Sequence, residues 1–568
     1  MPISPYDGYT AGSNWIRANQ PVVVTNAAAL RALDKTKIGY AVTKGYYSAG
    51  DGGAGEYWYD SSDTTSTDNG GSVIVGSDSG RWKLIEKGVA NVKKWGAKGN
   101  GSFDDTQFLY NCMYNNGTVF FPPGVYIISS EVYLPGSGVQ IIGAGIERTT
   151  IEFTGTQGIS VGAKNNSSRY NSFVLRDVTI SGNNRANTVS AFKLYSLSWF
   201  HVSNVLFYQI AGAAIYSENC WDGTVKTCHF QYCGNTTTSL SPLHMEKASG
   251  GENNHWNISD CQFEDNYTTD IFNRGLSNEA DHFISRNKFG IASYSPTADL
   301  DTQYYHIVLI DTVGTSVEDN WFFTGGCLYA ENSVGFKMQN NSGRYLSSGV
   351  YIQTGSGYNI SGNRFEGNNL STQYIGSMSA SHYGIAVGGA RGTLQNNDCF
   401  KFYTDHTILP AGSYNIITFP QANGSFVQTG SSGAVVLDSG ANTSMALGQE
   451  SGSWSPTASF ATGTISSVSF QSATYIRQNN KVFASVYIQL TDSGTGAGEL
   501  AISGLPYPSK TGSPVGVLGS EQYSNHKMIS GFLPGGSSSV YRILYFDGTS
   551  VASSGTRHDF LVTFEYLI

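Results

Sequence analysis

Charged side chains, paired cysteines and long apolar runs are all scarce in this 568-residue sequence. Asp, Glu, Lys and Arg make up only 13% of it, and the formal net charge is −9, so a polyanionic nucleic acid is not an expected partner. No apolar run approaches the ~18 residues that a membrane-spanning helix needs. The N-terminus also lacks the basic start and apolar core of a signal peptide. We therefore expect neither membrane insertion nor a cleaved leader.

The seven cysteines predict a reduced protein. Their number is odd and none has paired CxxC spacing, which indicates free, buried thiols and synthesis in a reducing cytoplasm. A protein made there can still act outside the cell if lysis releases it. The sequence has no His/Cys zinc spacing and no Gly-x-Ser-x-Gly elbow, so neither a metal nor a cofactor is expected.

Glycine and aromatic residues are abundant instead. The sequence holds 68 Gly, 35 Tyr and 29 Phe, and Ser, Thr, Asn and Gly separate its short apolar runs. This composition is typical of an all-β protein with many turns. The length suffices for about three or four domains.

A four-residue pattern, polar–polar–x–Phe, recurs through the middle of the chain. It ends at Ile180, Phe207, Phe230, Phe263, Phe289, Phe322, Phe365 and Phe400. The intervals are 27, 23, 33, 26, 33, 43 and 35 residues, as expected for coils in the mid-twenties with loop insertions of variable length. Two further short strands lie between most of these positions, and three strands per coil predict a right-handed parallel β-helix.

The second residue of the pattern changes little from coil to coil. It is Cys228, Cys261, Asn287, Asn320 and Asn363 in five consecutive occurrences. Like residues stack at one level of a solenoid, so we expect two cysteines followed by a structural asparagine ladder inside the core.

A short helix is predicted near residues 102–117. Ser102 or Asp104 can cap its start, and "NNG" at Asn115–Gly117 can end it. Its apolar side chains fall on one face: Phe108, Leu109, Cys112 and Met113. Because a β-helix exposes open strand edges at its ends, we expect this helix to cap the N-terminal end.

Residues 91–129, with "GAKGNG", "DDT" and "FPPGVY" in order, resemble the entry motif of the pectate-lyase-like superfamily, in particular of bacteriophage tailspikes. Asn100 stands where Asp is usual, which does not affect the fold. Residues 1–88 resemble a head-proximal β-rich domain, and 89–404 would form the β-helix. Residues 405–450 read as a bridge. Residues 451–568 alternate like the strands of a β-sandwich for trimerisation or carbohydrate binding.

The resemblance implies a homotrimeric tailspike on the phage virion. Its N-terminal domain would bind phage tail or adaptor proteins, and its β-helix would bind and cleave a bacterial capsular polysaccharide at the cell surface. Superfamily membership does not set the chemistry, because lyases, hydrolases and esterases share the fold.

The second strand of each coil supplies the best candidate site. Aligning inward apolar residues places Glu218, Glu246 and Arg274 in one outward column over three coils, with His244 beside it. Neighbouring strands are ~4.8 Å apart, so two carboxylates there suit glycosidic hydrolysis. A one-residue slip would turn these side chains inward. A solvated salt-bridge ladder is the structural alternative.

Inserted loops supply a second set of candidates, since long insertions on solenoids build binding surfaces. Glu252, Glu279 and Asp281 could replace either acid of the column. Sugar-binding candidates are Trp256, Tyr304, Tyr305, Asp299 and Asp301. The last two could recruit Ca²⁺, although two carboxylates are a weak signal for such a site.

Three other functions remain open. A polysaccharide lyase would use a base on a uronic acid and a cation such as Arg274, with His244 nearby. A receptor-binding fibre or a deacetylase would leave the polymer length unchanged.

Overall fold

We describe the protein from a computed structural model. It covers residues 21–568 except 87, 135–137, 165–169, 188–189, 249–250, 277–280, 291–303, 368–382, 403, 409–415, 420–425, 429–434, 439–448, 479–480, 513–514, 524–526, 546–548 and 550–556. The chain forms two compact units, one with residues 1–429 and 438–443 and one with residues 430–437 and 444–568. None of the described helices is long and apolar enough to cross a membrane.

The first unit begins with a small five-stranded sheet in the order β1-β2-β3-β5-β4. Its elements are β1 (Val22–Val24), α2 (Ala27–Arg31), β2 (Tyr40–Thr43), β3 (Glu56–Tyr59), β4 (Val73–Val75) and β5 (Arg81–Leu84). Leu30, Tyr57, Ile74 and Trp82 are fully buried in its core. The Tyr47 hydroxyl donates to the Gly96 carbonyl at 2.8 Å, which ties this sheet to the chain that follows.

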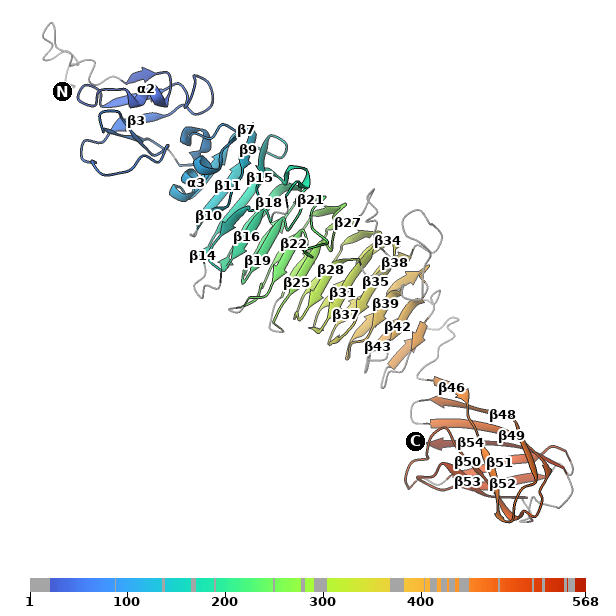
Figure 1. Cartoon of the computed structure of the whole chain (residues 1–568). Coiled ribbons are helices and arrows are strands. Elements are labelled where there is room, and N and C mark those ends of the chain that lie inside the picture. The colour runs from blue at the N-terminus through green and yellow to red at the C-terminus, as the bar shows by residue number, and fades with distance from the viewer. Residues whose placement is uncertain are drawn as a thin grey trace, which may run out of the picture. The chain divides into compact units, whose positions relative to one another are not determined.

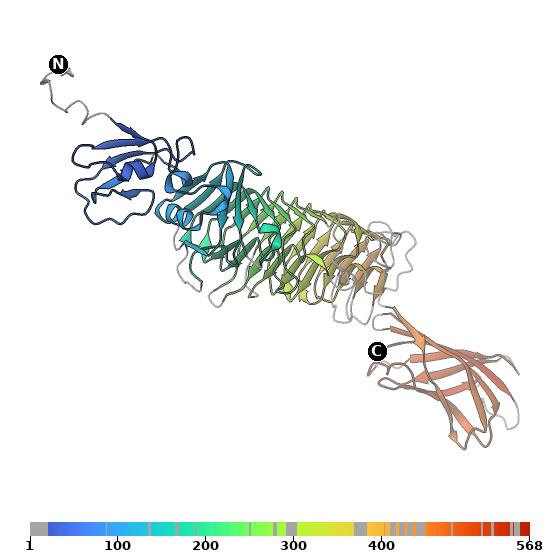
Figure 2. The same cartoon turned by 45° about the horizontal axis from the view of Figure 1, so that its top comes forward.

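A parallel β-helix follows (Figures 1 and 2). One wall is a 12-stranded sheet of β10 (Val132–Leu134), β13 (Ile159–Val161), β16 (Phe192–Tyr195), β19 (Ile215–Glu218), β22 (Leu243–Glu246), β25 (Ile271–Arg274), β28 (Tyr305–Ile310), β31 (Gly326–Glu331), β35 (Ser348–Ile352), β39 (Tyr383–Val387), β42 (Thr404–Ile408) and β44 (Phe426–Gln428). The predicted all-β class and parallel β-helix are confirmed. β42 and β44 carry this wall into the segment that the sequence assigned to a bridge.

A 24-stranded sheet supplies the other two strands of each coil. Its members are β6 (Ala90–Asn91), β7 (Asn100–Asp104), β8 (Thr118–Phe121), β9 (Gly124–Ile128), β11 (Val139–Gly143), β12 (Thr149–Phe153), β15 (Phe173–Ser181), β18 (His201–Tyr208), β20 (Thr224–Lys226), β21 (His229–Gln231), β23 (Asn257–Ser259), β24 (Gln262–Glu264), β26 (Phe283–Ser285), β27 (Lys288–Gly290), β29 (Ser316–Glu318), β30 (Trp321–Phe323), β33 (Lys337–Gln339), β34 (Ser342–Leu346), β37 (Asn359–Ser361), β38 (Arg364–Gly367), β40 (Thr393–Gln395), β41 (Asp398–Phe400), β43 (Ile416–Phe419) and β45 (Val435–Asp438). Two-residue pairs complete the corners: β14 (Tyr170–Asn171) with β17 (Leu197–Ser198), and β32 (Ser333–Val334) with β36 (Gly355–Ser356). Short 3₁₀ turns are η1 (Val92–Trp95) and η2 (Asn183–Arg185).

The predicted helix lies at the N-terminal end of the stack as α3 (Thr106–Asn115), beside the first strands in Figure 1. It buries Leu109, Cys112 and Met113 and contacts β10, the terminal strand of its sheet. The predicted start at residue 102 was too early because residues 100–104 form β7 instead. Asp104 accepts a hydrogen bond from the Thr106 amide at 3.0 Å.

The asparagine ladder is confirmed and is longer than predicted. The Oδ1 atom of Asn320 accepts the Asn287 amide at 2.9 Å, and its Nδ2 donates to the Ile284 carbonyl at 2.9 Å. Asn341 and Asn397 are further buried rungs. Each rung satisfies backbone groups that would otherwise be buried without partners. All seven cysteines are free and buried.

The 43-residue interval of the sequence repeat hides one complete coil. Gly343 pairs with Phe322 on one side and Phe365 on the other, so this coil has glycine at the phenylalanine level. The Leu346 side chain fills the space, because a Cβ on Gly343 would lie 2.9 Å from it. The last repeat was placed one residue too late: Cys399, not Phe400, is level with Phe365.

The second unit is a nine-stranded antiparallel β-structure in the order β46-β48-β49-β54-β51-β52-β53-β50-β47. Its strands are β46 (Gln449–Ser453), β47 (Thr457–Thr462), β48 (Ser467–Gln478), β49 (Lys481–Asp492), β50 (Ala497–Ser503), β51 (Val515–Glu521), β52 (Met528–Leu533), β53 (Ser539–Tyr545) and β54 (His558–Leu567). Val482, Ile488, Leu500 and Phe560 lie in one core between its layers. The predicted C-terminal sandwich is confirmed.

Candidate functional site

The 12-stranded wall holds the predicted column in the predicted register. Glu218 on β19 pairs with Glu246 on β22, and the pairing of His244 with Phe272 puts Arg274 of β25 next in line. The alternating residues Ile215 and Met245 are fully buried inside the coil. Because side chains alternate along a strand, the two glutamates and the arginine share the outer face of the wall.

Glu246 is held as a carboxylate. Its Oε2 atom lies 3.4 Å from Nη1 of Arg274 and 3.6 Å from Nε2 of His244, and its Oε1 accepts the Lys247 amide at 3.2 Å. Burial raises the pKa of Glu246, but His244 and Arg274 outweigh burial and lower it below the ordinary 4.5. Glu246 is therefore ionised at neutral pH.

Glu218 is more enclosed, with its side chain only 5% exposed. Its Oε1 accepts from the Tyr216 hydroxyl at 2.7 Å and lies 2.9 Å from Nζ of Lys164. Its Oε2 has no hydrogen-bond partner among the described residues. The carboxyl lines a pocket of about 290 Å³ together with Lys193 and Tyr195. Glu218 thus faces a space that a ligand can enter.

His244 is oriented by its neighbours. Its Nδ1 accepts the Ser241 amide at 3.4 Å, so in the neutral ring the proton sits on Nε2, which faces Glu246. The ring stacks between Tyr216 at 5.4 Å and Phe272 at 4.6 Å. His244 therefore supports the Glu246 carboxylate from one side.

Glu252 is the second-tier acid that the structure brings near this site. It is 5% exposed, and its Oε2 accepts the amide of Leu276, two residues beyond Arg274. Burial raises its pKa, and the Leu276 amide only partly opposes this shift. The pKa values of Glu246 and Glu252 are thus shifted in opposite directions, although no described contact joins their carboxyl groups.

Two of the three aromatic residues predicted to bind sugar, Trp256 and Tyr305, point into the protein, so these two predictions were wrong. Trp256 is fully buried, donates to the Cys220 carbonyl at 2.9 Å and packs on Phe200 at 4.5 Å. The Tyr304 hydroxyl points to the buried Asp270 at 3.4 Å. Tyr305 is 6% exposed. Neither Trp256 nor Tyr305 offers a ring face to a polymer, whereas Tyr304 is partly exposed and its role in sugar binding stays a prediction.

Asp281 is the one remaining loop candidate that the structure describes, and it does not join the column. Asp281 lies 3.8 Å from the exposed His255 at a corner of the coil, and no described contact links it to Glu246. Glu279, Asp299 and Asp301 lie outside the described residues. Within the described part of the chain, no three His, Cys, Asp or Glu side chains are grouped to hold a metal ion.

An aromatic row lies beside the acidic column, and apart from His244 its members were not among the predicted site residues. Tyr216, His244 and Phe272 pair strand to strand, and Tyr329 and Tyr351 continue the row after Val308. Tyr329 and Tyr351 stack at 5.9 Å with a 4° interplanar angle, and both are partly exposed. The second residue of "IYSE", "IFNR", "LYAE" and "VYIQ" carries this signal.

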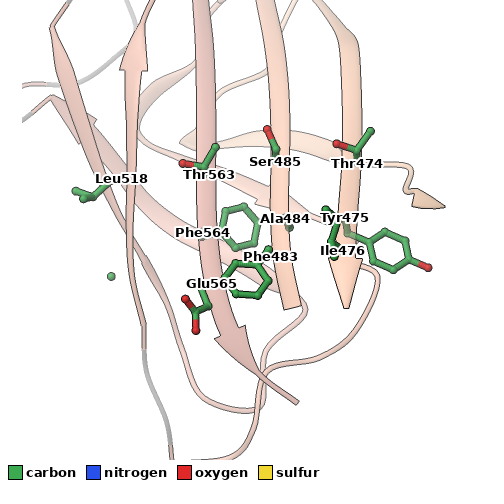
Figure 3. Close-up of a pocket in the computed structure, with 11 residues that line it drawn as sticks. Thr474, Tyr475, Ile476, Phe483, Ala484, Ser485, Leu518, Thr563, Phe564 and Glu565 are labelled. Atoms are coloured by element: carbon green, nitrogen blue, oxygen red, sulfur yellow. The ribbon is translucent and has the colours of Figure 1, made fainter. Parts of the chain in front are cut away.

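The C-terminal unit has its own pocket of about 480 Å³ on β48, β49, β51 and β54 (Figure 3). Its lining is mostly apolar, with Phe483 and Leu518 exposed. The one carboxylate there, Glu565, pairs with Lys481 at 2.6 Å. No second acid lines this pocket, so a two-carboxylate site belongs to the β-helix.

Comparison with known proteins agrees with this architecture. Residues 23–87 match the family described as phage tail protein small four-stranded beta-sheet domain, and residues 89–321 match the family described as rhamnogalacturonase A/epimerase, pectate lyase-like. The Dettilon tailspike protein has a TM-score of 0.52 at 11% identity, over 84% of this chain and 94% of that one. The enzymatically active domain of tailspike protein 2 from bacteriophage CBA120 has a TM-score of 0.50 at 12% identity, over 98% and 84%. At such identities the similarity establishes the fold.

Proposed function

Because the chain joins a phage tail β-sheet domain to a pectate-lyase-like β-helix, we propose that it is a phage tailspike that depolymerises a bacterial capsular polysaccharide. The tailspikes that share its fold support this proposal, and one of these structures is the enzymatically active domain of its tailspike. In this proposal the protein is a homotrimer made in the host cytoplasm. It attaches to the phage tail through residues 1–88 and acts at the bacterial surface.

The reaction in this proposal is glycosidic hydrolysis by Glu218 and Glu246. The observation that carries it is their pairing on adjacent strands of one outer face. Strands of a sheet are ~4.8 Å apart, close to the ~5 Å separation of carboxyls in retaining glycosidases. The ionised Glu246, held by Arg274 and His244, attacks the anomeric carbon.

Glu218 donates the proton to the leaving oxygen in this scheme. Before a sugar binds, Nζ of Lys164 lies 2.9 Å from Oε1 of Glu218. Lys164 is 57% exposed, so a sugar entering the pocket can displace it without unfolding the wall. Glu252 is the alternative donor, because burial raises its pKa.

The polymer would lie along the aromatic row of the same wall. Tyr216, Phe272, Tyr329 and Tyr351 lie on the outer face of this wall, and their partly exposed rings could contact the C–H groups of sugars. Arg274 could bind the carboxylate of an acidic sugar through its guanidinium fork. A polymer bound along this row would cross successive strands of the wall rather than follow a single strand.

Two single variants separate the proton donors. Glu218→Gln should lower kcat by at least about a hundredfold if Glu218 is the donor, with Glu252→Gln within a few-fold of wild type. The reverse result would transfer the role to Glu252. If Glu218→Gln, Glu252→Gln and Glu246→Gln all keep kcat within a few-fold of the wild type, the two-carboxylate mechanism is rejected.

A lyase is the second candidate, because Arg274 and His244 lie beside Glu246 as a cation and a base for a uronic acid. Elimination gives an unsaturated product that absorbs in the near ultraviolet, and hydrolysis does not. A fibre without enzymatic activity, or a deacetylase, leaves the polymer length unchanged. Chain sizing with ultraviolet detection distinguishes hydrolysis, elimination and the absence of cleavage.

A further inference from the structure

A second pocket lies on the 24-stranded sheet, away from the wall that carries Glu246. It has a volume of about 220 Å³ and lies over β24, β27 and β30. Its main lining residues are Gln262, Glu264, Lys288, Gly290, Trp321 and Phe323. We call it the Gly290 pocket.

Gly290 leaves this space open although the backbone does not require glycine there. It pairs regularly with Glu264 and Phe323, and its φ is not in the left-handed region. An added Cβ would make only ordinary contact, 3.4 Å from the Cβ of Phe323. Glycine within a strand is destabilising, and it often marks a place where a ligand or another chain approaches closely.

The walls of the pocket combine aromatic faces with polar groups. Trp321 is 40% exposed and stacks on Phe323 at 5.7 Å with an interplanar angle of 18°. Across the gap, Oε2 of Glu264 accepts from Nε2 of Gln262 at 3.2 Å and from Nε2 of Gln231 at 3.4 Å, and it lies 3.1 Å from Nε2 of His229. Lys288 forms no ion pair with any residue that the structure describes. The pocket therefore offers an apolar platform, a carboxylate and an ammonium group within one hollow.

We infer that the Gly290 pocket is a second polysaccharide-binding site, which takes one sugar unit of the polymer that the proposed function assigns to this protein. The C–H face of the sugar would lie on Trp321, and its hydroxyls would bind Glu264 and Lys288. A pocket of about 220 Å³ takes a single sugar ring, and contact with a second copy of the chain is the alternative that sedimentation tests. The site would hold the polymer while the 12-stranded wall cleaves it.

Two variants test this inference in the full-length Glu246→Gln protein, which should bind polymer without cutting it. Gly290→Val fills the pocket with a residue that strands favour, and Trp321→Ala removes the platform. Trp199→Ala is the control, because Trp199 is 59% exposed and lies outside both sites. The probe is a panel of purified capsular polysaccharides in affinity electrophoresis, with sedimentation and thermal melting on each variant.

We expect both pocket variants to raise the Kd for the bound polysaccharide about tenfold, with sedimentation and melting as in the parent protein and no change for Trp199→Ala. An unchanged Kd in both variants, or a change in oligomeric state, would overturn the inference. If wild-type protein shortens a polymer that the pocket variants bind normally, only this inference fails. If a polymer is bound through the pocket and never shortened, only the proposed cleavage fails. Binding to none of the panel would overturn both.

Discussion

Glu246→Gln tests the ionised carboxylate of the proposed mechanism. The substitution keeps the shape of the side chain and removes the charge that faces Arg274 at 3.4 Å and His244 at 3.6 Å. A positioned acid, base or nucleophile contributes about 10²–10⁴-fold, so kcat should fall by at least about a hundredfold. Stability should change little, about 0–1 kcal/mol, because the Arg274 side chain is 39% exposed and solvent screens the pair.

Glu366→Gln is the matched control for this experiment. Its side chain is 20% exposed, against 21% for Glu246, and it is likewise paired with an arginine, Arg344, at 3.8 Å. Reducing-end release from capsular polysaccharide gives kcat, and denaturant titration gives the free energy of unfolding. A Glu246→Gln enzyme within a few-fold of Glu366→Gln in kcat would show that the column is only a solvated ladder of charges.

The dependence of kcat/KM on pH is a second test of the role of the ionised Glu246. Because His244 and Arg274 lower the pKa of Glu246 below 4.5, the ionised form persists below the range where an ordinary glutamate protonates. The acid limb of kcat/KM should therefore lie below pH 4.5 in the wild type. In Arg274→Ala it should shift upward. The stabilisation that ionised Glu246 gains from Arg274 is complete above the pKa of Glu246 in the unfolded chain. It is lost as the pH falls through the lower pKa of Glu246 in the folded protein.

Three further predictions concern the rest of the chain. Trp256→Ala should lower the free energy of unfolding by about 3–5 kcal/mol and leave polysaccharide affinity unchanged; weaker binding at unchanged stability would restore its predicted role in binding. Deleting residues 1–88 should leave polymer cleavage nearly intact, and loss of cleavage in a folded trimer would place part of the site there. Removing residues 451–568 should give monomer or aggregate in sedimentation, since a C-terminal clamp would hold three β-helices together, and a native-sized trimer would contradict this.

The repeat pattern sufficed for the register of the wall because both faces of each strand are constrained. Ile215, Leu243 and Ile271 are apolar and fully buried, and a slip of one residue would turn Glu218, Glu246 and Arg274 toward the core. The coil between Phe322 and Phe365 was not predicted because its repeat lacks the phenylalanine. Gly343 stands at that level, and the Leu346 side chain fills the space.

The inward direction of Trp256 follows from an offset that the sequence analysis did not use. Phe200, Trp256 and Tyr358 each precede the phenylalanine level of their coil by seven residues, and all three are buried. Gly223 stands at the same level between two of them, and the Phe200 ring occupies the space where its Cβ would be. Loop composition alone suggested a sugar-binding tryptophan, whereas counting back from the repeat would have placed it in the core.

Electrostatic roles were less predictable because they depend on contacts between distant residues. Lys164 reaches Glu218 from more than fifty residues away, and Leu276 binds Glu252 through its backbone amide. Neither contact leaves a local sequence pattern. The opposite pKa shifts of Glu246 and Glu252 therefore emerge only from the folded coil.

Mass spectrometry of oligosaccharides released from a panel of capsular polysaccharides tests the central claim most directly. Hydrolysis adds one water to each broken bond, so the account predicts saturated products whose masses equal whole repeat units plus water. Products lighter by that water would show elimination. Polymers returned at full length across capsules that the protein binds would contradict the assignment of a depolymerase.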